Sequence, residues 1–566
     1  MSNTNNAAKT VAIKVNQDRL LANLEFSFTN KETMLGEIIQ NARRAGATHV
    51  TFNYMTQGEL LIGDDGKGID DFQNLFSVAE SGWDVETMQK EKPFGMGWLS
   101  CLYGSKTIYV ESAGRYIEGN SSNILAGAAI EVKTNGNDIR KSYTQIILKG
   151  VKFSLDELKA SLKVLSSGFA IPVYLNGEKF KQADALSDGF IAVEGVGDIC
   201  APEIDLKNIQ YYHGGLDAYL AVYLQGLPVY DNRKSWREEV AVVVHLDSEI
   251  YNARMPDRDK LVNEKQVLDK ISHAINDIHL DRLKSLKDNL SPEDFAKEEI
   301  ASYALRIKGG FDLLCDKSVR LSSAFYGKVS TDQPSCWSDH ADSVSSDVSS
   351  YSFEDIDTGK CVLFTTESIS QDEGCPAAWI LARKLGFELI DNQTYWLKSD
   401  DFMGKHWAAP YVHELHDANV KVEIISEGKS GRVGLNWWDC NMVLCEAYKI
   451  TYTDPNGKVY EAVVEDEPLL TDDGKFLVPA KVNYIADAMY QASSYYSNNE
   501  FDEPGFNEDE RDINVYFEML RSGSVIKTLE QILRQVNLSS YQDLKGQKFE
   551  LLIDDNLEIN LSCIQA

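Results

Sequence analysis

The sequence predicts an α/β protein made of several domains. Helix-like and strand-like runs alternate over residues 10–190, as they do where helices cover a sheet. At roughly 150 residues per domain, the 566 residues would make three or four domains. Hydrophobic residues make up 43% of the chain and charged residues 25%, as in an ordinary globular protein. This composition excludes a largely disordered chain, a collagen-like fibre and a small disulfide scaffold.

Hydrophobic spacing predicts the elements of a first domain, residues 1–190. Apolar side chains at helical spacing predict a helix from Thr33 to Ala45. An Asn-Gly turn inside Ile171–Phe180 predicts a hairpin. Between them we expect two strands, His49–Tyr54 and Glu59–Gly63, then a second helix, Met96–Tyr103, and a third strand, Thr107–Glu111.

The rest of the chain divides into a second domain, a linker and a C-terminal region. Residues 191–330 contain the strand Val240–Leu246 and then a helical stretch that Ser291-Pro292 interrupts, because proline favours the first turn of a new helix. Residues 331–360 hold eight serines and seven acidic residues against one lysine, which predicts a linker. Residues 361–566 read as a mixed α/β region of unassigned role. Its expected features are a helix from Cys375-Pro376, a hairpin at Asp454–Gly457, an acidic loop at Asn498–Asp512 and an amphipathic helix at Val525–Val536.

The charge and cysteine content restrict the partners and the compartment. Lysine and arginine number 56 against 87 aspartate and glutamate, a formal net charge of -31. Such a surface repels phosphate backbones and anionic lipid, so nucleic-acid binding is not expected without a local basic patch. No window of about 18 uncharged apolar residues occurs, and no signal peptide is expected at the start, so we expect no membrane partner. Nine scattered cysteines without a CxxC pair favour a reducing cytoplasm.

A polar pair on the first predicted helix is the first candidate for chemistry. Glu37 and Asn41 are one helical turn apart and therefore share a face. A carboxylate in this position can orient a water, while an amide oxygen one turn later can coordinate Mg²⁺, which prefers oxygen ligands. The alternative is an ordinary solvated polar face.

The second candidate follows a predicted strand and reads Asp64-Asp65-Gly66-Lys67-Gly68. A carboxylate at a strand end can accept a hydrogen bond from an exocyclic amine, and glycines let the backbone approach a flat base. The alternatives are a tight turn or a cation-binding loop. An EF-hand is excluded because its ligand positions and closing glutamate are absent.

The third candidate, Gly95-Met96-Gly97, opens an apolar helix. Free backbone N–H groups and the helix dipole make such a start an anion site. Neither the GxxxxGK[ST] pattern of a P-loop nor a GxGxxG dinucleotide fingerprint after a first strand is present.

In this order and spacing, the three motifs resemble the N box, G1 box and G2 box of the GHKL ATPases. That superfamily comprises gyrase-type topoisomerases, heat-shock chaperones of the ninety-kilodalton class, histidine kinases and MutL. Phe94–Ser100 looks closest to the chaperone G2 box, and Ser142–Leu148 resembles the strand whose threonine supports the adenine site. The resemblance covers residues 15–185. It implies a Bergerat-type α/β sandwich that binds ATP and Mg²⁺.

The resemblance also implies roles for single residues. Glu37 would be the general base for the attacking water, Asn41 the Mg²⁺ ligand and Asp64 the partner of the adenine amine. Phe72–Phe94 would form the ATP lid. The nucleotide-binding set would be Asn41, Asp64, Gly66, Gly68, Ile69, Ser81, Phe94, Gly95, Met96, Gly97, Trp98 and Thr144. The chain departs from the family at Arg44, where an acidic residue is common.

Residues 191–330 resemble the transducer domain that chaperones, gyrases and MutL place after the ATPase domain, which is an α+β fold. Pro256-Asp257-Arg258 is similar to the Pro-x-Lys of MutL, so Arg258 would reach the γ-phosphate and act in catalysis. The alternative is that Arg254, Arg258 and Lys260 form an ordinary salt-bridged start of a helix.

Within the superfamily, the sequence favours a chaperone-like machine. No histidine precedes Glu37 to serve a histidine kinase, and no downstream metal motif suits a gyrase subunit or a MutL nuclease. We therefore expect an Mg²⁺-dependent ATPase that converts ATP to ADP and phosphate. Lid closure and formation of a homodimer would act on an unidentified protein client. The alternatives are a MutL-like or chromatin-type ATP-gated DNA clamp, and a nucleotide-sensing interaction protein with little turnover.

Overall fold

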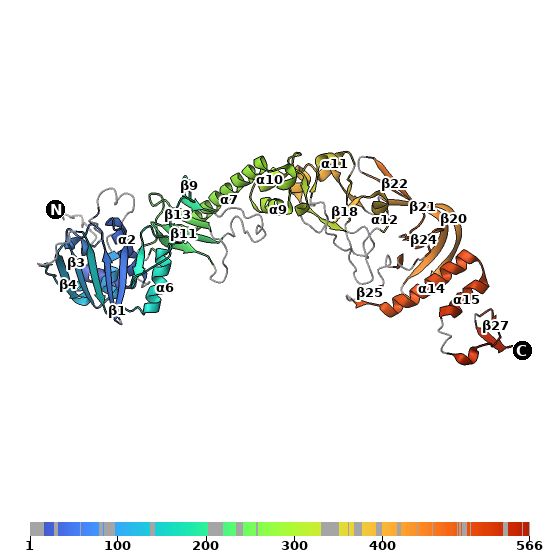
Figure 1. Ribbon diagram of the computed structural model, residues 1–566, viewed down its shortest axis with the longest axis horizontal. Helices are drawn as coiled ribbons and strands as arrows, with labels where there is room; N and C mark the ends of the chain where they lie inside the picture. Colours follow the sequence, from blue (N-terminus) through green and yellow to red (C-terminus); the bar gives the residue numbers. More distant parts are fainter. Residues whose placement is uncertain are drawn as a thin grey trace, which may run out of the picture. The chain divides into compact units, whose positions relative to one another are not determined.

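The computed structural model describes most of the chain, which folds into two compact units (Figure 1). One unit comprises residues 1–285 with 305–308, and the other comprises 286–304 with 309–566. Helices and strands are mixed in both units, and several sheets contain parallel and antiparallel pairs, which confirms the α/β class. The described residues are 16–27, 32–56, 58–78, 83, 97–135, 142–201, 219–233, 242–255, 258–329, 350–359, 361–366, 376–391, 399–415, 420–436, 438–454, 457–471, 473–483, 485, 488–489, 495–497, 500–535, 541–556 and 558–564.

The first unit begins with an eight-stranded sheet in the order β5-β4-β3-β6-β2-β1-β7-β8. Its strands are β1 (Val50–Thr56), β2 (Glu59–Asp64), β3 (Thr107–Ser112), β4 (Arg115–Asn120), β5 (Lys133–Thr134), β6 (Thr144–Lys149), β7 (Val173–Leu175) and β8 (Glu178–Lys179). All neighbours are antiparallel except β1 and β7. The β7–β8 hairpin turns at Asn176 and Gly177, with φ of 50° and 85°, which confirms the Asn-Gly turn.

In the described part of this domain, five helices accompany the sheet: α1 (Gln17–Leu24), α2 (Glu32–Arg44), α4 (Gly97–Gly104), α5 (Ser121–Leu125) and α6 (Leu155–Ser166), with short 3₁₀ turns at Glu25–Ser27 and Phe72–Leu75. Helix α2 buries Leu35 and Ile39 in the same core as Phe52 and Ile62 of the strands. The apolar spacing of Thr33–Ala45 therefore gave the correct helix and the correct inner face. The polar residues Glu37, Asn41 and Arg44 of this helix lie beside the core and line a cavity.

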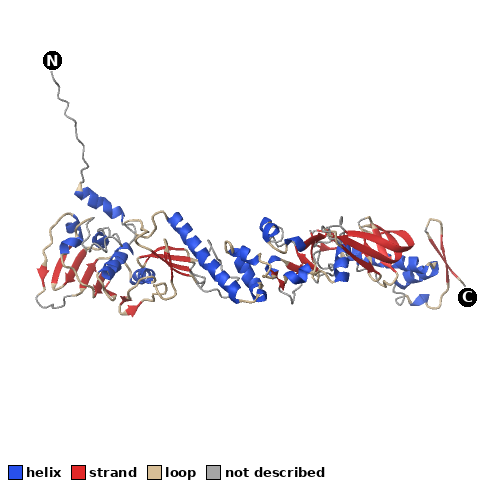
Figure 2. Cartoon of the chain, turned by 90° about the horizontal axis from the view of Figure 1, so that it is seen from above, coloured by secondary structure: helices blue, strands red, loops and turns tan. Residues whose placement is uncertain are grey.

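A second sheet of five strands follows in the same unit, in the order β12-β11-β13-β10-β9. Its strands are β9 (Ile191–Val193), β10 (Gly197–Cys200), β11 (Leu220–Leu224), β12 (Leu227–Asp231) and β13 (Val242–Leu246). The long helix α7 (Glu264–Asn289) packs on it, because Ile271 and Ile275 share a core with Val222 and Val244 (Figure 2). Every residue of β11 and β13 is buried, as expected for strands paired in parallel and covered.

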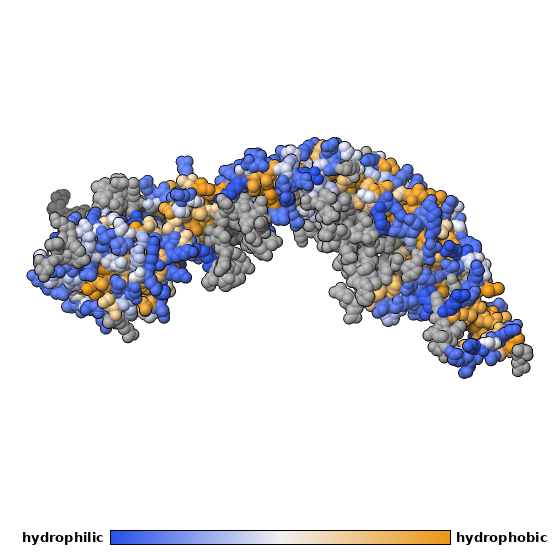
Figure 3. Space-filling model, viewed as in Figure 1, coloured by the Kyte–Doolittle hydropathy of each residue, from blue (hydrophilic) through white to orange (hydrophobic). Residues whose placement is uncertain are grey.

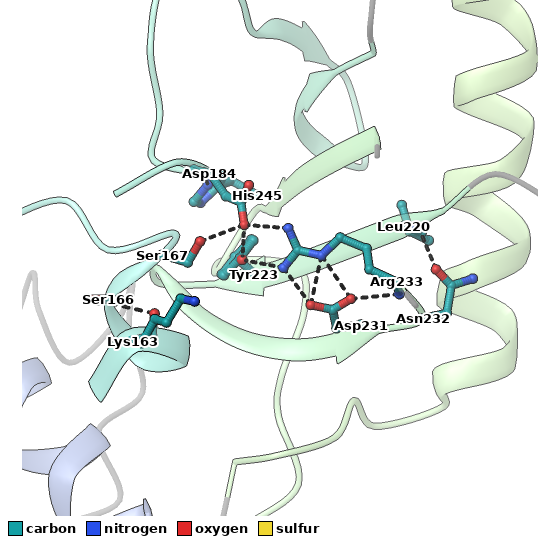
Figure 4. Close-up of polar contacts among 10 residues, drawn as sticks. All are labelled: Lys163, Ser166, Ser167, Asp184, Leu220, Tyr223, Asp231, Asn232, Arg233 and His245. Carbon is teal, nitrogen blue, oxygen red and sulfur yellow. Dashed lines mark hydrogen bonds and ion pairs between the residues drawn. The ribbon is translucent and has the colours of Figure 1, made fainter. Parts of the chain in front are cut away.

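A buried polar network connects the first sheet's last elements to the second sheet (Figure 4). The Asp184 carboxylate accepts hydrogen bonds from Ser167 Oγ at 2.7 Å, Tyr223 OH at 2.5 Å and Arg233 Nη1 at 2.8 Å. His245 Nε2 donates to the Asp184 carbonyl at 2.7 Å, and its ring stacks on Tyr223 with centroids 5.1 Å apart. Burial alone would raise the pKa of Asp184, but these hydrogen bonds outweigh it and hold the pKa below its usual value.

The second unit starts with short helices and strands around a four-stranded sheet in the order β15-β18-β17-β19. They are α8 (Pro292–Phe295), α9 (Glu298–Arg306), α10 (Gly310–Leu314), β14 (Leu321–Ser322), a 3₁₀ turn (Ser323–Phe325), β15 (Gly327–Val329), β16 (Ser350–Tyr351), α11 (Phe353–Asp357), β17 (Leu363–Thr366), α12 (Pro376–Leu385), β18 (Glu388–Asp391), α13 (Asp400–Lys405), a 3₁₀ turn (Ala409–Tyr411) and β19 (Val412–Leu415). Ser291 caps α8 and Pro292 occupies its first turn, which confirms the expected interruption of the helical stretch.

A long two-stranded ribbon organises the remainder of the second unit. The elements are β20 (Val420–Gly434), β21 (Asp439–Thr453), β22 (Val459–Val464), β23 (Leu469–Leu470), β24 (Lys475–Pro479), β25 (Tyr496–Ser497), β26 (Glu500–Phe501), α14 (Glu503–Ser522), α15 (Val525–Gln535), a 3₁₀ turn (Gln542–Leu544), β27 (Phe549–Ile553) and β28 (Ile559–Cys563). Strand β21 contributes to two cores, one with α12 and one with α14. Among the residues that the structure describes, no helix is long and apolar enough to cross a membrane.

Two expectations for the acidic segments were wrong. The segment Asn498–Asp512 was expected to be a loop, but α14 begins at Glu503, where Asp502 caps the helix by accepting from the Gly505 N–H at 3.2 Å. The prediction failed because it relied on the many acidic residues and overlooked the apolar residues at helical spacing. These are Phe506, Ile513, Phe517 and Leu520, which are buried on one face of α14. The end of the expected linker, residues 350–359, forms β16, which pairs with β14, and α11. Residues 331–349 and 360 lie outside the described part.

The C-terminal hairpin of β27 and β28 is amphipathic. Its register places Leu551 opposite Leu561 and Ile553 opposite Ile559, so these side chains share one face with Phe549. The opposite face carries mainly polar residues such as Glu550 and Ser562. Ile559 and Leu561 are 63% and 64% exposed, and apolar atoms gather at this end of the chain in Figure 3. The apolar face of this hairpin is therefore open to solvent.

Candidate functional site

A cavity of about 210 Å³ in the first unit brings together residues from three separate sequence motifs. Helix α2 supplies one wall, the segment after β2 a second, and the start of α4 with β6 a third. Nine residues of the predicted site line it: Glu37, Asn41, Asp64, Gly68, Ile69, Gly97, Trp98, Thr144 and Arg258. A cavity with polar groups converging from distant parts of the chain is the usual form of a small-molecule site.

The other predicted residues are not in the lining. Gly66 lies behind it, where its N–H donates to Asp64 Oδ1 at 2.9 Å and a Cβ would approach that of Ala45 to 2.7 Å. Only glycine therefore fits at position 66. Ser81, Phe94, Gly95 and Met96 lie outside the described residues. Of the expected lid, the structure describes residues 72–78 and Trp83.

Glu37 is held between α4 and a distant arginine. Its side chain is 8% exposed, and Oε1 lies 3.0 Å from Nε of Arg258, whose side chain is 12% exposed. On the other side, a Cβ at Gly97 would lie 2.1 Å from Glu37 Oε2. The start of α4 can therefore reach this carboxylate only because residue 97 has no side chain.

Arg258 is presented by a loop between β13 and α7. An isolated bridge joins Ala253 and Leu261, and the N–H of Arg254 donates to the Lys260 carbonyl at 2.7 Å. Arg258 itself has a φ of 55°, a left-handed conformation that is rare for a residue with a side chain. Helix α7 begins at Glu264, so the three cations of this segment do not form its first turn as the alternative interpretation required.

Asp64 lies at the end of β2, opposite Thr144 of β6. Burial raises the pKa of its carboxyl to about 6, against the hydrogen bonds from Gly66 and Thr144, which lower it. The next residue, Asp65, faces away from the cavity lining and accepts from the backbone and hydroxyl of Thr48. The paired aspartates therefore have different environments, and only Asp64 contributes to the cavity.

Several residues contribute to the cavity although the sequence gave them no role. Ser112 Oγ accepts from the Ile69 N–H at 2.8 Å and donates to the Tyr143 carbonyl at 2.7 Å. It therefore joins the segment after β2 to the residue that precedes Thr144. Lys67 and Trp83 also line the cavity, with the ammonium 5.2 Å from the ring centroid. The role of Ser112 could not be predicted, because a serine at a strand end does not change the hydrophobic pattern. The contact of Lys67 with Trp83 could not be predicted either, because the fold decides which groups surround a long, flexible side chain.

Arg44 lines the cavity one turn after Asn41. Its Nη1 lies 3.5 Å from Asn41 Oδ1 and its Nη2 lies 3.4 Å from Gln225 Oε1, on the turn between β11 and β12. Gln40 Nε2 donates to the Gln225 carbonyl at 2.9 Å. In the sequence, Arg44 stood out as a departure from the GHKL motif that this segment resembles.

The donor set suits a magnesium ion held mainly by a substrate. Asn41 offers an amide oxygen to the cavity, and in the described part of the chain no three His, Cys, Asp or Glu residues gather as a metal cluster. Mg²⁺ commonly keeps several waters and takes few protein ligands together with substrate phosphates. The residues present therefore fit a cation that enters with its phosphate ligand.

No protein-family model matches this sequence, and no curated protein matches it either.

Proposed function

We propose that the first unit binds ATP in this cavity and hydrolyses it to ADP and phosphate, as a GHKL-type ATPase. The observation that carries the proposal is the meeting of Glu37, Asn41, Asp64 and Thr144 in one cavity. These residues come from α2, β2 and β6, and all four belong to the segments that resemble the GHKL motifs. The lid closure, the homodimer and the protein client of a chaperone-like machine stay predictions.

The adenine end of the cavity would be formed by Asp64 and Thr144. A buried carboxylate accepts but cannot donate while it is ionised, so it selects the exocyclic amine of adenine over the carbonyl of guanine. Ile69 and Gly68 line the same region and offer backbone and an apolar side chain to a flat ring. Discrimination against a mismatched partner is large when a buried polar group would be left unpaired.

The phosphate end would be formed by Glu37, Asn41 and Arg258. Asn41 would hold Mg²⁺, which when bound neutralises phosphate charge. Glu37 would accept the proton of the attacking water, and this requires its pair with Arg258 to open. The released guanidinium then stabilises the charge that develops on the transferring phosphoryl group. Movement of the Arg258 guanidinium from Glu37 to the phosphate would make catalysis depend on the position of the loop after β13.

Adenine recognition predicts a pH-dependent affinity. The Asp64 carboxyl has a pKa of about 6, so it takes up a proton as the pH falls through that value and loses its acceptor character. We expect adenosine, which has no phosphate, to bind more weakly at pH 5 than at pH 7.5. Asp64→Asn should weaken ATP binding by about 1–3 kcal/mol and abolish this pH step. Calorimetry with adenosine, ATP and GTP measures both effects.

Asp65→Asn is the matched control, since Asp65 is adjacent but outside the lining, and its variant should keep the pH step. Equal affinities for GTP and ATP in the wild-type chain would contradict the adenine pocket. So would a pH step that survives in Asp64→Asn.

A second prediction concerns Arg258, which should matter for turnover more than for binding. Arg258→Ala is expected to lower kcat by about 10³-fold or more, as for other phosphoryl-transfer arginines, while ADP affinity hardly changes. Arg254→Ala, in the same loop but outside the cavity lining, should stay near wild type. Steady-state phosphate release and ADP calorimetry give the two readouts. If Arg254→Ala loses turnover and Arg258→Ala keeps it, the residue that reaches the γ-phosphate is Arg254 and not Arg258.

A further inference from the structure

The first half of strand β20 lies at an edge of its sheet. In the described part of the chain β20 pairs with β21 alone, in one register over Val420–Ile425 and in a shifted register after a bulge between Glu427 and Ser430. Such a bulge bends a strand, and Figure 1 shows β20 and β21 as a long curved ribbon. The side of Val420–Ile425 that faces away from β21 presents backbone N–H and C=O groups, and such an edge can pair with another strand.

The two faces of this half-strand differ in character. Val420, Val422 and Ile424 pack against the core formed by α12 and β21, but they are only half-buried, and a cavity of about 300 Å³ opens beside them. Lys421 and Glu423 are on the opposite face, where both are exposed, and the Glu423 side chain is 66% accessible. The edge therefore alternates apolar residues with one cation and one anion.

The order of these residues is complementary to itself in an antiparallel pair. When the segment Val420–Ile424 faces the same segment of a second chain with Val422 opposite Val422, Lys421 of each chain lies opposite Glu423 of the other. Opposite charges directly across two strands attract each other. The apolar residues of the two chains meet on the other face in the same way, so each chain covers half-exposed side chains of the other.

The charges also select this register over its neighbours. A shift of the pairing by two residues in either direction would place Lys421 opposite Lys421 or Glu423 opposite Glu423, and like charges directly across two strands repel. A shift by one residue would put charged side chains on the apolar face. Only the register centred on Val422 satisfies both faces.

We infer that this edge of β20 pairs with a second copy of the chain, in an antiparallel dimer with its two-fold axis at Val422. A two-fold interface requires a surface that is complementary to itself, and Val420–Ile424 has this property. Five residues per strand form a small interface compared with the usual size of about 800 Å² per partner, so the dimer should be reversible. The inference does not depend on the ATP site, and it gives a surface to the homodimer that the motif resemblance predicted.

Disulfide formation at the axis tests the register. Val422→Cys should give a covalent dimer under mild oxidation, because directly opposite Cα atoms lie about 4.5–5.5 Å apart, within the range of a disulfide. The full chain is used with Cys563→Ser, which removes an exposed thiol. Ile425→Cys is the matched control, since position 425 of one chain lies far from position 425 of the other in this register. Electrophoresis without reductant measures both, and equal cross-linking of the two variants would overturn the inference.

Charge reversal tests the ion pairs in sedimentation experiments over a concentration series. Lys421→Glu or Glu423→Lys alone converts two attractive pairs into two repulsive ones and should weaken the dimer by about 10-fold or more. An equimolar mixture of the two variants restores opposite charges at both pairs, so it should form a heterodimer. High salt should weaken the wild-type dimer, because exposed charges are screened.

Glu461→Lys is the matched control for charge reversal. Glu461 lies on β22, is 58% exposed and approaches Lys449 to 3.5 Å, much as Glu423 approaches the same ammonium at 3.4 Å. Its variant should dimerise as the wild type does. A wild-type chain that stays monomeric at every concentration would overturn the inference. So would a dimer that neither reversal weakens, or a mixture of the two variants that associates no better than each alone.

Discussion

Replacement of Glu37 by glutamine is expected to lower ATP hydrolysis by about 10²- to 10⁴-fold, the usual range for loss of a general base, while ATP still binds. Glutamine keeps the size of the side chain and its contact with Gly97, but it cannot take a proton from water. Phosphate release measures turnover, and calorimetry with ATP measures binding. The variant should therefore separate the two, with kcat falling and affinity retained.

Glu32→Gln is the matched control for this prediction. Glu32 lies in the first turn of the same helix, where it accepts from Ser161 Oγ at 2.7 Å, and it does not line the cavity. Its variant should hydrolyse ATP normally. Full turnover by Glu37→Gln would show that another group activates the water. Loss of ATP binding as well as turnover would show that the pair with Arg258 has a mainly structural role.

The second large effect is expected at Asp184, on stability rather than on chemistry. Asp184→Ala should lower the free energy of unfolding of the first unit by about 2–4 kcal/mol, because Ser167, Tyr223 and Arg233 all lose their acceptor. Arg233 is one-third exposed and also pairs with Asp231, which keeps the loss below that of a fully buried ion pair. Hydrogen exchange in β11 and β13 measures the opening of this sheet directly.

Ser167→Ala is the graded control, because it removes a single donor and should cost only about 0.5–1.5 kcal/mol. The pH dependence gives a second readout. The pKa of Asp184 is lower in the folded chain than its usual value, so its stabilising contribution is complete above about pH 4 and is lost as the pH falls through the folded pKa. Asp184→Ala should lack this acid-side loss. Unchanged exchange in the variant would mean that the network adds no net stability.

Local patterns predicted the elements that carry the cavity. The apolar spacing of α2 fixes which side of the helix enters the core, and so also fixes that Glu37 and Asn41 share another face. The Asn176-Gly177 turn followed from the need for two positive φ values in a two-residue hairpin. These inferences succeed because each depends on residues within one or two turns of one another.

Predictions from composition were wrong where acidic or serine-rich segments also contain apolar residues at helical or strand spacing. Acidic residues dominate the start of α14, yet Asp502 is its cap and Phe506 and Ile513 begin its buried stripe. Burial of these apolar side chains against β21 and β24 outweighs the repulsion among exposed carboxylates. The serine-rich composition of residues 331–360 likewise concealed Tyr351 and Ile356, whose side chains are buried.

The sequence by itself determined the order of the motifs, the shared face of Glu37 and Asn41, the position of Asp64 at a strand end and the presence of glycine at the start of the helix α4. Only the tertiary structure decided that Arg258 would face Glu37, that Arg44 would contact Gln225 181 positions away, and that Asp184 would accept three hydrogen bonds. Such pairs form when two sheets pack and remove their polar groups from water together. Because a buried donor must then find an acceptor wherever the fold places one, no periodicity along the chain records the partner.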